Sequence, residues 1–550
     1  MKRIHLYSIM ILLSVLPAAV QAQNDTIRRT VMVESIYNPV LASSEKRSFV
    51  PEEQLPVANR EEVVYADAVH DPGNLLREPF GSGVTRLRQE RLLPAYLRLG
   101  YGTRNNVDVL GLYRASLGRR DVLSLGASVM GWNGMIPFQG LAAPVDSGTW
   151  KSLRYDTDAR ISYAHEGSTR FGLSADVGYY VRNHLVANPL MLFATDQQNS
   201  LTYGGDGYLS TTFGNSPFEL GFRGGYHHWQ NSAWQGDTLA NAENHIQFDA
   251  DVAYRLRKGG RLQLSLTNHY LRYHQLQPDT LGHYFLGIRP QWVLEGKHST
   301  LALGLNVDVQ PADSQSVHVS PACRFTLTPA APVRLDLIVD GGRDLQTFSD
   351  LYRLSPWWTA DVPLRRAYTY VNARLHTGVR VAEGLHFGFG GGYRLTDDAL
   401  FATERITRGL LFTGLENHRA QVWHAGADAS YEWRDLFRLT TDFTYYGWLG
   451  VSDVPALLAF APQMDLSAAL RTRIVRGLTA DAAFRYRQFC DTGAGRRPAV
   501  ADLSLRADYA LNPVISLYVS GENLLNRQSG LCPAIPAQGI RAVGGLVLKL

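Results

Sequence analysis

Apolar and polar residues alternate along most of the chain after residue 94. In residues 171–182, FGLSADVGYYVR, the odd positions are apolar and the even positions are mostly small, polar or charged. Successive side chains of a strand point to opposite faces, so this segment predicts a strand with one apolar and one polar face. The same alternation recurs up to the C-terminus, with no convincing helical stripe. The pattern therefore predicts an all-β architecture.

The connections between the predicted strands alternate in length. Short turns follow one strand and long polar loops the next; the turns are residues 165–169, 214–217, 257–260, 295–298, 381–384 and 475–478, and the long loops include 132–152, 184–200 and 396–419. This asymmetry is typical of an antiparallel up-and-down barrel in a bacterial outer membrane, with short periplasmic turns and long external loops. We expect about 22 strands over residues 94–550, since such barrels have an even number.

A membrane barrel gives each face of a strand a different solvent. Backbone groups in lipid must all be paired, so the sheet has to close on itself. Phe171, Leu173 and Val177 would then meet outer-membrane lipid, whereas Asp176 and Arg182 would face the lumen. Aromatic residues near strand ends fit interfacial girdles, namely Tyr101, Tyr179, Tyr226, Tyr254, Trp292, Tyr393, Trp433 and Tyr509. The alternative is a soluble two-sheet assembly, but the persistent alternation and the loop asymmetry favour the barrel.

The first 93 residues carry no such pattern. Residues 1–22 combine basic Lys2 and Arg3, an apolar stretch over residues 9–20, and a small-residue end at Ala22, which predict a cleaved secretory signal. Residues 23–93 are broken by prolines and contain acidic pairs at 52–53 and 61–62. We interpret them as an irregular periplasmic or lumenal arm.

Composition excludes several classes of protein. Charged residues make up 19% of the 550, the net charge is +4, and no block of Lys and Arg indicates a nucleic-acid partner. The only cysteines are Cys323, Cys490 and Cys532, too few for a disulfide framework. Cys490 and Cys532 fall in the last two long loops, on the same oxidising side, where they form a candidate disulfide; Cys323 shares its face with Phe325 and should meet lipid.

The C-terminal segment resembles the last hairpin of TonB-dependent outer-membrane receptors. It contains a strand, the run Asn523, Leu524, Leu525 and Asn526, a loop, and a terminal strand that begins near Arg541. The resemblance implies a barrel of about 22 strands in a Gram-negative outer membrane. These receptors carry a globular plug before the barrel, whereas the arm here has only about seventy residues. The chain therefore most resembles plug-less relatives, which carry a Tyr-x-Pro element like Tyr37, Asn38 and Pro39.

The resemblance implies location and fold more than function. A short apolar patch at residues 30–34, TVMVE, faintly resembles the box that contacts the periplasmic TonB partner. Its alternative interpretation is a short strand of the arm. A TonB-like protein or a surface lipoprotein is thus an expected partner.

Charged residues on the predicted lumen face form the first candidate site. They include Asp176, Arg182, Arg223, Asp249, Asp251, Arg471, Arg485, Asp502 and Arg506. Near the C-terminus they are joined by Asp465, Arg473, Asp481, Arg487 and Asp508. These residues form either a selectivity surface for an anionic solute or a self-neutralising ladder of cross-strand pairs.

Four histidines form the second candidate site. His227, His245, His269 and His283 fall on the lumen parity of four consecutive predicted strands, each towards the extracellular side. Converging imidazoles bind transition metals or a haem-like ligand, although barrel shear can also leave them at different heights as ordinary wall residues.

Two classes of function remain. No Ser-His-Asp or paired-carboxylate spacing stands out, so we expect neither an enzyme nor a bound cofactor. The barrel is either a solute channel or partner-driven transporter, or a non-transporting structural or assembly component that docks other envelope proteins.

Overall fold

The structure is a computed structural model that describes most of residues 94–550. The described part omits residues 138–148, 184–196, 214–215, 232–240, 257–258, 275–280, 311–316, 331, 356–366, 408–409, 435, 451–454, 493–495 and 528–537. The predicted signal and arm lie outside the described residues, as does the 30–34 patch. Their assignments therefore stay predictions.

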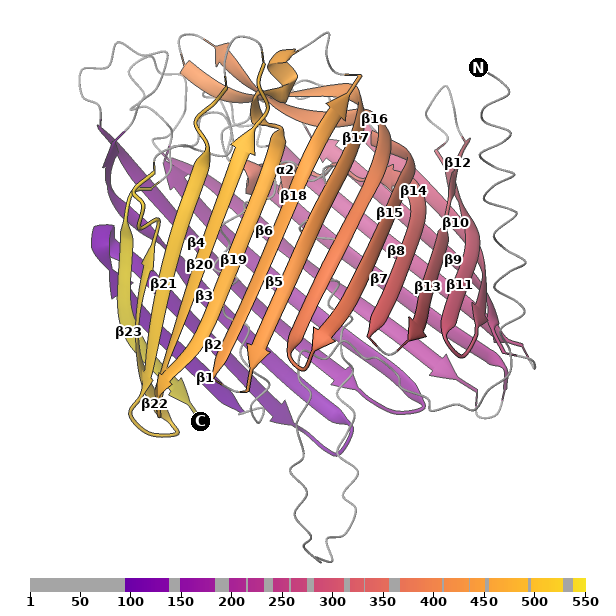
Figure 1. The fold of residues 1–550 in the computed structure, drawn as a ribbon, viewed down its shortest axis with the longest axis horizontal. Coiled ribbons are helices and arrows are strands. Elements are labelled where there is room, and N and C mark those ends of the chain that lie inside the picture. Colours follow the sequence, from indigo (N-terminus) through magenta and orange to yellow (C-terminus); the bar gives the residue numbers. More distant parts are fainter. Residues whose placement is uncertain are drawn as a thin grey trace, which may run out of the picture. The chain divides into compact units, whose positions relative to one another are not determined.

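The described residues form antiparallel strands that pair in sequence order around a barrel (Figure 1). The strands are β1 (Ala95–Gly102), β2 (Asn106–Ser116), β3 (Asp121–Pro137), β4 (Thr149–His165), β5 (Thr169–Asn183), β6 (Gln197–Thr212), β7 (Phe218–Asn231), β8 (Asn241–Arg255), β9 (Arg261–His274), β10 (Leu281–Glu295), β11 (Ser299–Val309), β12 (Val317–Pro321), β13 (Cys323–Ala330), β14 (Val333–Asp344), β15 (Ala367–Ala382), β16 (Leu385–Thr407), β17 (Leu410–Trp433), β18 (Phe437–Leu449), β19 (Pro462–Val475), β20 (Leu478–Phe489), β21 (Val500–Ala510), β22 (Ile515–Glu522) and β23 (Arg541–Lys549). Three short helices join them, namely η2 (Thr103–Asn105), α2 (Phe348–Leu354) and η3 (Pro455–Phe460).

The sheet closes into 22 barrel strands, as predicted. Segments β12 and β13 are one barrel strand, because both pair with β11 in the same register on either side of Ala322. The last strand, β23, pairs with β1 from Tyr96 opposite Lys549 to Gly102 opposite Val543. Every strand within the described sheet therefore has two neighbours, which satisfies its backbone groups in lipid.

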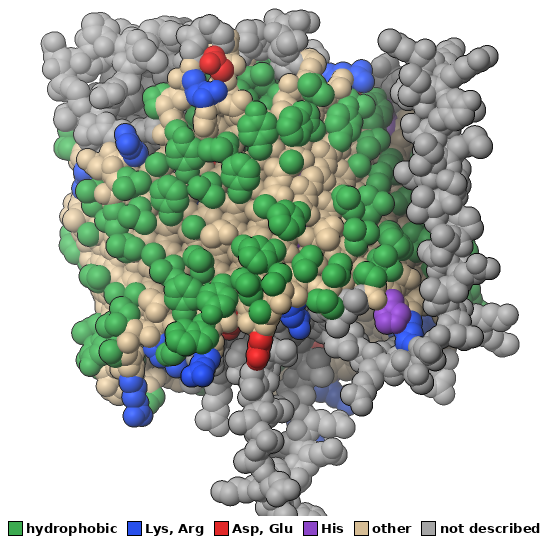
Figure 2. Space-filling model, viewed as in Figure 1, with side chains coloured by type: hydrophobic (Ala, Val, Ile, Leu, Met, Phe, Trp, Pro, Cys, Tyr) green, Lys and Arg blue, Asp and Glu red, His purple; other side chains and the backbone are tan. Residues whose placement is uncertain are grey.

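The outer face of the barrel is apolar. Figure 2 shows a broad band of hydrophobic side chains on this face, with charged side chains near the upper and lower rims. On β5, Phe171, Leu173 and Val177 are exposed, and Val177 is 46% exposed at mid-strand. Seven of the eight predicted girdle aromatics are also exposed, and Tyr393 is half-buried. No helix among the described residues is long and apolar enough to cross a membrane.

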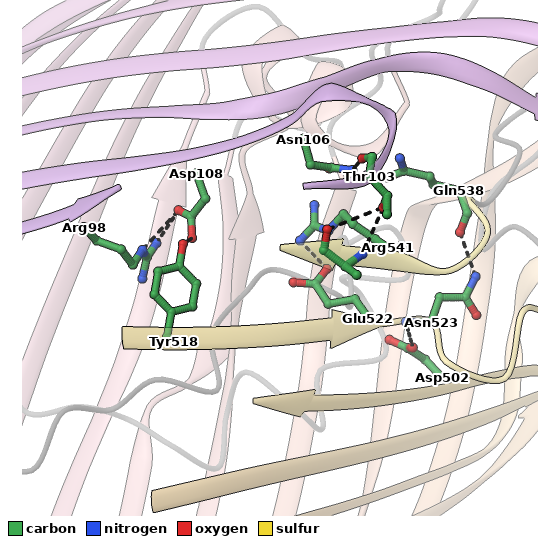
Figure 3. A network of polar contacts seen from close by, with 11 residues as sticks. Arg98, Thr103, Asn106, Asp108, Asp502, Tyr518, Glu522, Asn523, Gln538 and Arg541 are labelled. Atoms are coloured by element: carbon green, nitrogen blue, oxygen red, sulfur yellow. Dashed lines mark hydrogen bonds and ion pairs between the residues drawn. The ribbon is translucent and has the colours of Figure 1, made fainter. Parts of the chain in front are cut away.

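Polar contacts reinforce the seam between β1, β2, β22 and β23 (Figure 3). Asp108 accepts hydrogen bonds from Arg98 at 2.8 Å and from the Tyr518 hydroxyl at 2.9 Å. The resemblance placed a terminal strand near Arg541, and β23 begins there. The preceding turn uses Asn523 at φ 47°, a left-handed conformation that asparagine tolerates. Its backbone N–H donates to the Asp502 carboxylate at 2.9 Å.

Residues 396–419 are not a loop, and this expectation was wrong. They form the far half of the β16–β17 hairpin, whose orange end leans over the upper rim in Figure 1. A register shift between Thr396 and Ala399, with Asp398 at φ 53°, makes a bulge where the hairpin bends. The far half lies beyond the level where strands must present lipid with an apolar face, so polar residues there do not mark a loop.

Candidate functional site

Helix α2 lies in the segment between β14 and β15 and packs inside the barrel. Thr347 caps its N-terminus, because the Thr347 hydroxyl accepts the Asp350 backbone N–H at 3.0 Å. Phe348, Leu351 and Tyr352 share one helix face and are buried, Phe348 completely so at 0% exposure. The segment is therefore packed against protein rather than extended into solvent.

Lumen-facing aromatic residues receive this helix face. The Phe348 ring centroid lies 4.9 Å from that of Tyr273 on β9 and 5.8 Å from that of Trp229 on β7. Leu271 and Phe285 complete this side of the buried cluster. Aromatic contacts of this kind contribute stability beyond their buried area.

Hydrogen bonds fix the ends of the α2 segment, residues 346–355. The buried Glu243 carboxylate on β8 accepts the Phe348 backbone N–H at 2.6 Å. The Tyr273 hydroxyl donates to the Gln346 carbonyl at 2.7 Å, and the Ser355 and Thr413 hydroxyls lie 2.8 Å apart.

The α2 segment also meets residues of other strands. Ala402 of β16 and Leu415 of β17 belong to the same buried cluster as Trp229 and Phe285 of β7 and β10. On β5, the Arg182 guanidinium lies 5.9 Å from the centre of the Tyr352 ring. Burial raises the pKa of Tyr352, so its hydroxyl stays protonated near neutral pH. Strands from widely separated parts of the barrel thus contact one helix.

The predicted histidines lie on the lumen face just below this contact. His245 and His269 are neighbours, with Nε2 of His245 3.0 Å from Nδ1 of His269. His227 is the cross-strand register partner of His245. His283 lies apart from them, with its ring 5.2 Å from that of Tyr273. The structure thus brings together three of the four histidines.

Two aspartates join His227. Its Nε2 atom lies 3.1 Å from Asp206 Oδ1, and Asp176, Asp206 and His227 each offer one ligand atom within 4.8 Å of the others. Asp176 was a predicted lumen residue, whereas Asp206 was not singled out. The available signal was its setting in GGDG, residues 204–207, where small residues leave space around one carboxylate.

The remaining predicted lumen residues are mostly paired. Arg487 makes a two-bond contact with Asp465 at 2.7 Å for each bond, and Arg471 pairs with Asp481 at 3.3 Å. Further contacts join Arg506 to Asp508, Arg182 to Asp156, Asp251 to Ser265 and Asp502 to Asn523. In the strand register, Arg223 lies opposite Asp249 and Arg485 lies opposite Asp502. Such pairing favours a self-neutralising wall near the C-terminus.

Cys490 and Cys323 are free thiols in the described part of the chain. Cys532 lies outside it, so the bridge from Cys490 to Cys532 stays a prediction. If mass analysis of denatured, unreduced protein finds three alkylated cysteines, that bridge does not exist.

The Cys490 thiol should react slowly in the folded protein. Its Sγ lies 3.7 Å from the Pro462 carbonyl, and burial raises its pKa to about 12, so little thiolate forms at pH 8. We expect iodoacetamide to label Cys490 much more slowly in native protein than in urea. Equal rates in the two conditions would contradict this burial.

Comparison with known proteins identifies the fold. No family model and no curated protein matches the sequence. Among solved structures, the FrpB iron transporter from Neisseria meningitidis is similar at a TM-score of 0.63 and 10% identity, over 83% of this chain and 81% of that one. A ferric enterobactin receptor from Pseudomonas aeruginosa has a TM-score of 0.61 at 10% identity, over 83% and 80%. The copper transporter OprC has a TM-score of 0.57 at 11% identity, over 83% and 80%.

Identities this low establish architecture, and the architecture agrees with the apolar outer face and the closed seam. The chain is an outer-membrane barrel with the 22-strand fold of the TonB-dependent receptors.

Proposed function

We propose that the protein moves a solute across the outer membrane through its barrel, as a channel or as a transporter driven by a periplasmic partner. The carrying observation is that helix α2, in the segment that connects β14 to β15, packs inside the lumen above a wall of histidine and carboxylate side chains. A stopper on a connection can leave the lumen without any change in strand pairing. The iron and copper transporters of the same fold support the proposal.

The second candidate is a structural component that docks other envelope proteins. It is favoured by the complete burial of Phe348, because a well-packed apolar contact would also serve a permanently closed barrel. A scaffold needs no cargo and no opening, so conductance distinguishes the two candidates.

We expect two segments to obstruct the path through the barrel one after the other. These stoppers are α2 in the lumen and the arm at the periplasmic mouth. The test compares four proteins in planar bilayers: the intact mature chain, a deletion of residues 24–85, a replacement of residues 346–355 by a Gly-Ser linker of equal length, and the combination. A barrel of 22 strands is too wide for wall side chains to fill. The combined variant should therefore conduct most, and each single variant should conduct less because one stopper remains.

The experiment tests the role of the arm and the transport proposal separately. If the arm deletion adds nothing to the α2 replacement, the arm does not close the barrel and is better interpreted as a docking tail. If all four proteins are silent, the transport proposal is wrong and the scaffold candidate stands. A TonB-like partner is tested by cross-linking at residues 30–34.

A further inference from the structure

Three potential metal ligands converge on one point of the lumen wall from three adjacent strands. Asp176 lies on β5, Asp206 on β6 and His227 on β7. Asp176 and His227 both lie opposite Gly204, one on each side of β6. Asp206 is two residues further along β6 and therefore points to the same side of the sheet.

Two glycines make room for these ligands. A Cβ atom at Gly204 would lie 2.2 Å from His227 Nδ1, and one at Gly225 would lie 2.3 Å from Asp206 Oδ1. Any other residue at either position would displace the imidazole or the carboxylate. The two glycines thus leave room for the His227 and Asp206 side chains beside Asp176.

The two carboxylates differ in how they are held. Asp206 Oδ1 accepts a hydrogen bond from Gln247 Nε2 at 3.0 Å, which orients it beside His227. The Asp176 side chain makes no hydrogen bond or ion pair with any other described residue, and its register partner Arg160 contacts Ser174 instead. An unpaired carboxylate beside an oriented one is a favourable setting for a divalent cation, which would neutralise both.

We propose that Asp176, Asp206 and His227 bind one divalent first-row transition-metal ion on the lumen wall. Imidazole nitrogen and carboxylate oxygen suit ions such as Zn²⁺, Co²⁺ and Fe²⁺, and three protein ligands leave a position open for water. Ligand atoms about 2.1 Å from one ion lie no more than about 4.2 Å apart. The observed limit of 4.8 Å needs only a small carboxylate rotation to reach that value.

The site lies directly beneath the α2 contact. Trp229, which packs on Phe348, is two residues beyond His227 on β7, and Glu243 has the same relation to His245 on β8. Two residues of strand span about 7 Å. An ion arriving from outside would reach the site after α2 is displaced; this route rests on the proposed function, whereas binding itself does not.

The test is Co²⁺ titration of the purified full-length mature protein in detergent, followed by its visible absorption spectrum, with Zn²⁺ as competitor. Wild type should give one saturable spectrum that Zn²⁺ displaces. Asp176→Asn and His227→Gln keep side-chain size and should each weaken Co²⁺ binding by at least about tenfold, since even residues that only support a ligand change affinity by that much. Heat-modified migration on gels checks that each variant is folded.

His376→Gln is the matched control. His376 also pairs with a lumen aspartate, Asp428 at 2.9 Å, but on the opposite part of the barrel, and it belongs to no group of three potential ligands among the described residues. It should bind Co²⁺ like wild type. The proposal is overturned if wild type shows no saturable spectrum, if the two ligand variants bind normally, or if the control loses binding equally. Conductance is a separate measurement, so metal binding by a silent barrel would reject transport and keep the site.

Discussion

Replacement of Phe348 by alanine should release helix α2 from the lumen wall. Phe348 is completely buried between Trp229 and Tyr273, and loss of a buried phenylalanine side chain typically costs about 3–5 kcal/mol. Because α2 is a local element, the cost should appear as easier local opening, with little change in barrel stability. Amide exchange at Leu351 and Ser355, whose N–H groups donate within the segment, should accelerate by about two to four orders of magnitude.

Phe222→Ala is the control for this measurement. Phe222 lies on the outer face of the same strand as Trp229 and is exposed there. Its loss should leave exchange in α2 unchanged. If the Phe348 variant exchanges like wild type at Leu351, the apolar contact does not hold the segment, and the proposed closure of the lumen by α2 is wrong.

Val177→Arg should destabilise the barrel by about 2–4 kcal/mol, the usual cost of arginine on the lipid face near mid-membrane. Val177 is at the middle of β5 and its side chain is exposed on the apolar outer face. Its neighbour Asp176 points into the lumen, so Asp176→Asn should cost much less. The comparison is made by reversible unfolding in lipid vesicles, and equal effects of the two substitutions would refute the assignment of faces.

The barrel was predictable from sequence because every strand that crosses the membrane must present an apolar face to lipid. The apolar positions of residues 171–182 lie outside, and the glycine turns at Gly384 and Gly477 adopt positive φ at the short connections. A strand that extends beyond the membrane does not need an apolar outer face. The far half of the β16–β17 hairpin was therefore mistaken for a loop.

Helix α2 was missed because seven residues give too short a period to recognise. Its signals were present: Thr347 and Asp350 form a cap, and Phe348, Leu351 and Tyr352 have helical spacing. What the sequence lacks is any sign that this connection folds inwards. That depends on Trp229 and Tyr273, which belong to strands more than seventy residues away.

The candidate metal site was also predictable from sequence only in part. Alternation places His227, His245, His269 and Asp176 in the lumen, but only the register between strands determines which of them meet. A shift of two residues between β6 and β7 would keep every side chain on its face and still change which residues lie opposite Asp206 and His227. Side-chain direction was therefore predictable, whereas the height of each residue in the barrel was not.

The pairing of β1 with β23 has a consequence for how the barrel is made. Within the described sheet every other pair joins strands that are neighbours in sequence, so hairpins can form one after another as the chain emerges. The final pair must instead wait for the last residues, Arg541–Lys549, and until then the sheet has two open edges that hydrocarbon does not tolerate. Without these nine residues the sheet could not close, and the barrel could not insert stably into the membrane. Early proteolytic removal of β23 would therefore prevent the whole barrel from assembling.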